Sequence, residues 1–249
     1  MFDLTGKTAL VTGANTGLGQ GMALALARAG AHIALIGRSN PGETEALIAN
    51  TGRRSCFVRA DLNDIDAVGV IIEEAVSKLG RADILVNNAG IIKRCDAMDF
   101  RPEDWDAVMN VNLRTLFFLS QAFARHLISK NLTGKIINIA SMLTFQGGIR
   151  VPSYTASKSG VGGLTKALAN EWAQHGINVN AIAPGYFATD NTAALQADTK
   201  RNAEILERIP SGRWGKPSDL AGAVVFLASQ ASDYVQGITL PVDGGWLSR

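Results

Sequence analysis

Seven short apolar runs alternate with longer segments of helical periodicity along this chain of 249 residues. Most of the runs are unbroken, a pattern typical of strands buried on both faces of a parallel sheet. Such alternation predicts a doubly wound α/β sheet of seven parallel strands flanked by helices, with right-handed crossovers. The expected strands are Thr8–Thr12, His32–Gly37, Ser55–Ala60, Ile84–Asn87, Lys135–Ala140, Ile177–Ile182 and Ile238–Val242. The expected helices are Leu18–Ala29, Glu43–Asn50, Ile65–Leu79, Pro102–Lys130, Tyr154–His175 and Pro217–Ser229.

One segment interrupts the alternation. Gly185–Gly215 is polar and only weakly helical, over Thr192–Ile209. An insertion of this length in a compact domain is more often functional than spare chain. No linker or low-complexity tract divides the sequence. We therefore expect a single domain over residues 1–249, with a lid over about residues 187–212.

Composition and charge exclude several classes of protein. With 47% hydrophobic and 18% charged residues, the chain has enough apolar side chain for a core and is unlike disordered sequences. The formal net charge of +2 argues against a dedicated nucleic-acid binder. The longest apolar stretch, Met22–Gly37, contains Arg28 and His32, and no secretory signal is recognisable. Cys56 and Cys95 are isolated and the histidines are scattered, so no disulfide or metal site is expected. These features predict a cytoplasmic protein without a membrane or nucleic-acid partner.

A glycine-rich turn links the first expected strand to the first expected helix. It reads Thr12-Gly13-Ala14-Asn15-Thr16-Gly17-Leu18-Gly19. Glycines at such a bend let the backbone approach a pyrophosphate, and the helix N-terminus offers free N–H groups and a partial positive charge. The spacing differs from the commoner Gly-x-Gly-x-x-Gly, and a plain tight turn is the alternative. Its position between strand and helix favours a dinucleotide site formed by Gly13, Asn15, Thr16, Gly17, Leu18 and Gly19.

The ends of the next expected strands suggest how the rest of a dinucleotide binds. Gly37 stands where many dinucleotide folds have an acid that repels a 2′-phosphate. Arg38 can pair with that phosphate, which favours NADP(H), although a plain surface arginine is the alternative. Asp61, next to Leu62, either accepts a hydrogen bond from the adenine amino group or caps the following helix. Asn88, Ala89 and Gly90 supply small and amide groups where the backbone would lie against a ribose.

Four polar residues in the second half suggest acid–base chemistry. Tyr154 and Lys158 share one face of an expected helix, Ser141 follows the fifth expected strand, and Asn112 lies within Pro102–Lys130. An unperturbed tyrosine titrates near about 10, too high for proton transfer at neutral pH. A cation about 4 Å away is worth roughly 4 kcal/mol at an effective dielectric of about 20, enough to lower that pKa by about three. Each residue alone also has an ordinary structural explanation.

Taken together, these motifs resemble the short-chain dehydrogenase/reductase family over essentially the whole chain. The motifs are TGANTGLG, NNAG, the Asn112 segment, Ser141, YTASK and Pro184-Gly185. The resemblance implies a Rossmann fold, an NAD(P)(H) cofactor, a tetrad of Asn112, Ser141, Tyr154 and Lys158, and a homotetramer. Tyr154 would take the hydroxyl proton, Ser141 would hold the substrate oxygen, and Asn112 would hold a water. Lys158 would lower the pKa of Tyr154 and anchor the nicotinamide ribose. The family pattern also places Pro184, Gly185, Phe187 and Thr189 at the cofactor.

Longer stretches narrow the resemblance within that family. FQGGIRVPSYTASKSGV and ILERIPSGRWGKPSDL resemble dehydrogenases of deoxy sugar acids such as 2-deoxy-D-gluconate and 2-dehydro-3-deoxy-D-gluconate. This implies hydride transfer to or from a sugar acid and favours NAD(H), whereas Gly37-Arg38 favours NADP(H). A 3-oxoacyl-thioester reductase and a non-catalytic dinucleotide-sensing protein are the alternatives.

An acidic substrate needs a cation or several N–H donors, because burying an unpaired carboxylate costs several kcal/mol. Arg94 and Arg150 are the candidates, each with a solvated or inter-subunit ion pair as the alternative. We expect Arg94 to contribute more, since Val151-Pro152 stiffens the chain after Arg150. The expected substrate site comprises Ser141, Gln146, Tyr154, Arg94, Arg150 and Tyr186.

Overall fold

The computed structural model describes residues 1–249, apart from the side chain of Asn191. Its centre is one seven-stranded parallel sheet in the order β3-β2-β1-β4-β5-β6-β7. The strands are β1 Thr8–Thr12, β2 His32–Gly37, β3 Ser55–Arg59, β4 Ile84–Asn87, β5 Gly134–Ile139, β6 Ile177–Pro184 and β7 Thr239–Val242. The predicted doubly wound parallel sheet is therefore confirmed.

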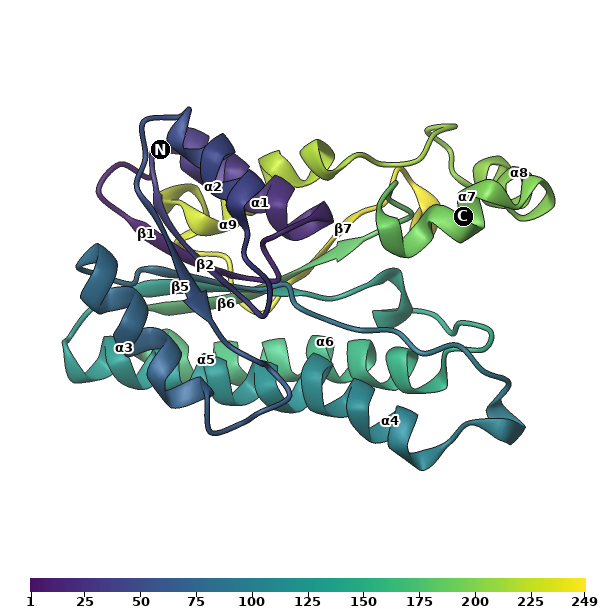
Figure 1. The fold of residues 1–249 in the computed structure, drawn as a ribbon, viewed down its shortest axis with the longest axis horizontal. Helices are drawn as coiled ribbons and strands as arrows, with labels where there is room; N and C mark the ends of the chain where they lie inside the picture. The colour runs from purple at the N-terminus through teal and green to yellow at the C-terminus, as the bar shows by residue number, and fades with distance from the viewer.

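Helices cover both faces of the sheet, as Figure 1 shows. They are α1 Gly17–Arg28, α2 Gly42–Ala49, α3 Val68–Leu79, α4 Pro102–Met109, α5 Leu116–Ser129, α6 Pro152–Trp172, α7 Ala193–Ala197, α8 Thr199–Arg208 and α9 Ala221–Ala228. In Figure 1, α1, α2 and α9 lie on one face and α3 to α6 on the other, while α7 and α8 lie beyond one end of the sheet. Successive β1 side chains point to opposite faces, so Val11 joins the apolar core beneath α1 and Leu10 joins the one beneath α3 and α5.

The helix expected over Pro102–Lys130 is interrupted. A π-helical segment, Asn110–Thr115, separates α4 from α5. Within this segment the Asn110 amide donates to the Asn63 carbonyl at 2.8 Å, and the Thr115 hydroxyl donates to the Leu62 carbonyl at 2.6 Å. The π-helical turn, which is wider than an α-helical turn, therefore coincides with hydrogen bonds to a loop that is distant in sequence.

Other expected helices also differ: α6 is Pro152–Trp172 instead of Tyr154–His175, and Pro217–Leu220 is a 3-10 segment before α9. The helix expected from Ile65 begins at Val68, because Asp64 lies in a preceding turn, where its carboxylate accepts from the Asp66 N–H at 2.9 Å. The single helix expected over Thr192–Ile209 is two helices, α7 and α8. They are separated at Asp198, whose side chain caps α8 by accepting from the Arg201 N–H at 3.0 Å.

The sheet order creates a crevice beside β1. From β1 the strand order continues through β2 and β3 toward one edge of the sheet, and from β4 it continues through β5 and β6 to β7 at the other edge. The connections that follow β1 and β4 therefore lead away from each other. The Thr12 hydroxyl ties the two loops together by accepting the N–H groups of Asn88 and Ala89, both at 2.9 Å. Within the described residues, no helix is long and apolar enough to span a bilayer, and no three His, Cys, Asp or Glu side chains are grouped as a metal site.

Candidate active site

A cavity of about 1030 Å³ lies at the carboxyl ends of the strands, between their loops and α8. Every predicted cofactor and substrate residue lines it, from the glycine turn after β1 to Thr189 in the predicted lid. Of the predicted tetrad, Ser141, Tyr154 and Lys158 are in the wall. Asn112 is buried behind it, with its Oδ1 3.2 Å from the position that a Cβ on Gly90 would occupy.

The glycine turn forms one part of the cavity wall. Gly17 opens α1 with a φ of +56°, a left-handed conformation that favours glycine. A Cβ on Gly19 would collide with the Gly13 carbonyl oxygen and lie 2.5 Å from Asn88 Nδ2. The Asn88 amide in turn donates to the carbonyls of Thr12 and Gly13 at 2.9 and 3.2 Å. The turn therefore exposes backbone without side chains just before the N-terminus of α1. We call this turn the pyrophosphate cradle, because such a backbone can approach a pyrophosphate closely.

The ends of β2 and β3 provide the next part of the wall. Arg38 is exposed there, after Gly37. The Asp61 carboxylate accepts from the N–H and the side-chain amide of Asn63 at 3.0 and 3.1 Å. Asp61 thus closes a local turn, and the alternative that it caps the next helix is wrong, because α3 begins at Val68.

Tyr154 and Lys158 project from the first two turns of α6, with the Lys158 ammonium 5.6 Å from the centre of the tyrosine ring. Burial lowers the pKa of Lys158 to about 8, and the ammonium donates to the Ile139 carbonyl at 2.6 Å. Burial also raises the pKa of Tyr154, while a hydrogen bond with Ser141 and the charge of Arg94 act to lower it. The pKa of Tyr154 is raised overall, and the groups that act to lower it here are Ser141 and Arg94; the lowering by Lys158 stays a prediction.

Asn112 connects the loop after β4 to α6 from within the π-helical segment. Its Oδ1 accepts from the Ile91 N–H at 2.8 Å, and its Nδ2 donates to the Ile91 carbonyl at 3.0 Å and to Ser157 Oγ at 3.2 Å. Asn112 therefore holds the backbone next to Gly90, which lies close to Lys158 Nζ.

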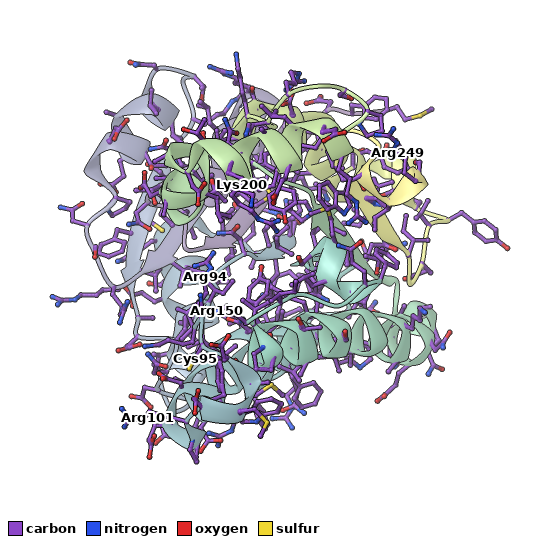
Figure 2. All side chains as sticks on the ribbon, turned by 90° about the vertical axis from the view of Figure 1, so that its right-hand side faces the viewer. Arg94, Cys95, Arg101, Arg150, Lys200 and Arg249 are labelled. Atoms are coloured by element: carbon purple, nitrogen blue, oxygen red, sulfur yellow. The ribbon has the colours of Figure 1, made fainter. Side chains whose placement is uncertain are left out.

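Another part of the cavity wall contains the predicted substrate residues. Figure 2 shows Arg94 and Arg150 between the helix that carries Lys200 and the helical layer below. Arg150 is engaged with Asp96, with 3.1 Å between Nε and Oδ1, and its carbonyl accepts from the Cys95 N–H at 3.0 Å. No such ion pair of Arg94 occurs among the described residues.

The remaining wall comes from residues that the sequence did not indicate as site residues. They are chiefly Arg201, Glu204, Ile205 and Arg208 of α8, together with Trp246 near the C-terminus. Trp246 packs against Tyr186 with ring centres 4.8 Å apart and donates to Gln146 Oε1 at 3.2 Å. The α8 residues recur at i, i+3, i+4 and i+7, so their spacing could have identified one helical face.

Comparison with known proteins places this arrangement in a family. The family model described as enoyl-(acyl carrier protein) reductase matches residues 13–247. The chain is 62% identical to 2-dehydro-3-deoxy-D-gluconate 5-dehydrogenase of Escherichia coli strain K12, over 100% of this chain and 98% of that protein.

Solved structures agree with this match. One, provisionally assigned as a 2-deoxy-D-gluconate 3-dehydrogenase from Agrobacterium tumefaciens and containing NADP, is 58% identical, with a TM-score of 0.96 over 100% of this chain and 99% of that one. A gluconate 5-dehydrogenase from Burkholderia cenocepacia, in complex with NADP and tartrate, is 41% identical, with a TM-score of 0.94 over 100% and 98% of the two chains. The chain therefore belongs to the short-chain dehydrogenase/reductase family.

Proposed function

We propose that this enzyme transfers hydride between NAD(P)(H) and a secondary alcohol or ketone of a deoxy sugar acid, of the 2-dehydro-3-deoxy-D-gluconate or 2-deoxy-D-gluconate type. One observation carries the proposal: the proton-transfer group Tyr154 and a cation, Arg94, lie in the wall of the same cavity as the pyrophosphate cradle. The activities named for the similar proteins are of the same type.

The chemistry divides between the cofactor and the side chains. A nicotinamide ring supplies the hydride acceptor or donor. In the oxidative direction, Tyr154 accepts the proton of the substrate hydroxyl, and the Ser141 hydroxyl holds the same oxygen in place. Arg94 favours the phenolate form of Tyr154, because its charge lowers the tyrosine pKa. Lys158, with a pKa of about 8, can release or accept a proton near neutral pH and anchors the ribose. Asn112 positions the backbone at Gly90 and Ile91 and holds a water that extends the proton relay from Lys158 toward solvent.

The other cofactor and substrate residues keep the roles expected from their positions. The glycine turn binds the pyrophosphate, Asp61 and Leu62 face the adenine, and Asn88 to Gly90 face the ribose. Pro184, Gly185, Phe187 and Thr189 bind the nicotinamide end, while Gln146 and Tyr186 contact substrate hydroxyls. Gly37 and Arg38 favour NADP(H), in agreement with the NADP in two similar structures. Residues 187–212 act as a lid that excludes water from the reaction.

A spectrophotometric screen of sugar acids with NAD and NADP tests the proposal. We expect cofactor reduction with 2-deoxy-D-gluconate, and we expect Tyr154→Phe to lose at least about a hundredfold in kcat, as removal of a general base does. A Tyr154→Phe variant with nearly full turnover would refute the assignment.

A 3-oxoacyl-thioester reductase is the second candidate, since a 3-oxoacyl-[acyl-carrier-protein] reductase of Synechocystis sp. is 39% identical over 98% of this chain and 98% of that protein. Turnover of an acetoacetyl thioester faster than that of every sugar acid would favour it. The cytoplasmic location and the homotetramer remain predictions; sedimentation should give a mass four times 26.3 kDa.

A further inference from the structure

Two arginines of α8, Arg201 and Arg208, line the cavity. Arg201 is occupied, because its Nη1 donates to Glu204 Oε2 at 2.9 Å. The carboxylate of Asp198 is also occupied, because it accepts from the Arg201 N–H and so caps the helix. In contrast, Arg208 has no carboxylate partner among the described residues. An unpaired guanidinium in a cavity wall is available for an anion.

Arg208 is held in a defined orientation. Its guanidinium carbon lies 4.1 Å from the centre of the Trp246 ring, a cation–π contact. Its Nη2 donates at 3.4 Å to Gln146 Oε1, the same oxygen that accepts from Trp246 Nε1. Trp246 is buried, with 5% of its surface exposed, so the guanidinium rests on a fixed ring. A stacked guanidinium uses its face for the ring and keeps N–H donors at its edge, the geometry that binds a carboxylate through two bonds.

We propose that Arg208 is a specificity-determining residue that binds the carboxylate of the acidic substrate from the lid side of the cavity. This inference rests on the proposed function, which supplies the acidic substrate. Arg94 offers a cation from the loop after β4, and Arg208 offers a second one from α8.

The position of Arg208 on the lid has a consequence for closure. A ligand shifts a conformational equilibrium only by its difference in affinity for the two states. An acidic substrate contacts α8 through Arg208, whereas an uncharged analogue has no charge for Arg208 to bind. Substrate charge therefore favours the closed lid.

The test compares Arg208→Met with Lys200→Met. Methionine retains an apolar chain over the Trp246 ring, so the packing is preserved. Lys200 belongs to the same helix, where Figure 2 labels it, is exposed and is not among the residues that line the cavity, so its replacement removes an equal charge. The substrates are 2-deoxy-D-gluconate and 2-deoxy-D-glucitol, which differ only in the carboxylate.

We expect Arg208→Met to raise KM for the acid about tenfold and to change KM for the polyol less than about twofold. Lys200→Met should leave both KM values unchanged. An unchanged acid-to-polyol KM ratio in Arg208→Met would overturn the proposal.

Hydrogen exchange gives a readout without turnover. Reduced cofactor and 2-deoxy-D-gluconate together form a dead-end complex, because neither can accept a hydride. In wild type and Lys200→Met, the acid should slow amide exchange in α7 and α8, and the polyol should not; in Arg208→Met this protection should be lost. Retained protection would contradict the proposal. If wild type oxidises no sugar acid, the proposed function fails. The effect of the acid on amide exchange in α7 and α8 then decides by itself whether Arg208 binds the carboxylate.

Discussion

Arg38 is the side chain at which the choice between the two dinucleotides is most easily tested. It is exposed at the end of β2, and Gly37 beside it offers no negative charge to repel a 2′-phosphate. Arg38→Ala should weaken NADP(H) binding about tenfold, the effect of one lost charge-assisted hydrogen bond, and change NAD(H) binding less than about twofold. Fluorescence titration with both cofactors measures the two affinities. An unchanged preference would show that Arg38 does not contact the phosphate.

Arg94 and Arg150 differ in how much of their charge is already paired. Because Asp96 pairs with Arg150, Arg94→Met should raise KM for a sugar acid more than Arg150→Met does. We expect about tenfold against about twofold, with a much smaller effect of Arg94→Met on an uncharged polyol. Steady-state kinetics with both substrates provide the comparison. Equal effects of Arg94→Met on acid and polyol would mean that Arg94 does not bind the carboxylate.

The charge of Arg94 also acts on the proton-transfer step. It lowers the pKa of Tyr154, so its removal leaves that pKa higher. Oxidation needs the deprotonated tyrosine, and the rise of kcat with pH should therefore move to higher pH in Arg94→Met. A pH profile of kcat for a polyol, which has no carboxylate, isolates this effect. A shift to lower pH would contradict it.

Elements with a strong local pattern are predictable from the sequence, and those shaped by distant contacts are not. β2 and β4 are nearly unbroken apolar runs, and their observed ends coincide with the predicted ones. The π-helical Asn110–Thr115 has an ordinary helical pattern, but its side chains bond to Asn63, Leu62 and Ile91, which lie far away in sequence. The division between α7 and α8 depends on one cap, Asp198.

That cap allows a test of the lid. Asp198 accepts from the Arg201 N–H, and of the described α8 side chains only Ile205 is fully buried, so α8 has few other stabilising contacts. Asp198→Ala should cost about 1 kcal/mol, which corresponds to roughly fivefold faster amide exchange in α8. Exchange in α6 serves as the internal reference and should not change. Equal exchange of α8 in both proteins would show that the cap does not limit lid opening.

Across the whole molecule, the site combines parts that are predictable with parts that are not. The loops after β1, β4 and β5 carry recognisable motifs, and the parallel sheet brings their carboxyl ends to one edge. The substrate end depends on Gln146 meeting Trp246, residues separated by 100 positions. No local pattern reports such a contact, so α8 and the C-terminus enter the site only through the fold.

The same fold buries Lys158, with a consequence for the stability of the whole protein. Only 4% of this side chain is exposed, and burial lowers its pKa from 10.5 to about 8. Below about pH 8, both the folded and the unfolded chain carry the ammonium, so the cost of burying the charge is fully present. Between about pH 8 and 10.5, the folded chain has lost this proton while the unfolded chain retains it, and the free energy of unfolding therefore rises with pH.

Comparison with Lys158→Met isolates this group, because the variant is of similar size and lacks the titrating amine. A difference of one pKa unit corresponds to about 1.4 kcal/mol. Between about pH 7 and 10.5, the free energy of unfolding of wild type should therefore rise by on the order of 3 kcal/mol relative to that of the variant. Tyr154, whose pKa is raised above its ordinary 10.0, acts in the opposite direction above that pH and is common to both proteins. Urea unfolding at intervals across this range measures the difference. Stability curves that stay parallel from pH 7 to pH 10 would show that Lys158 is not the buried cation this structure describes, since a lysine already neutral or fully solvated would leave no such slope.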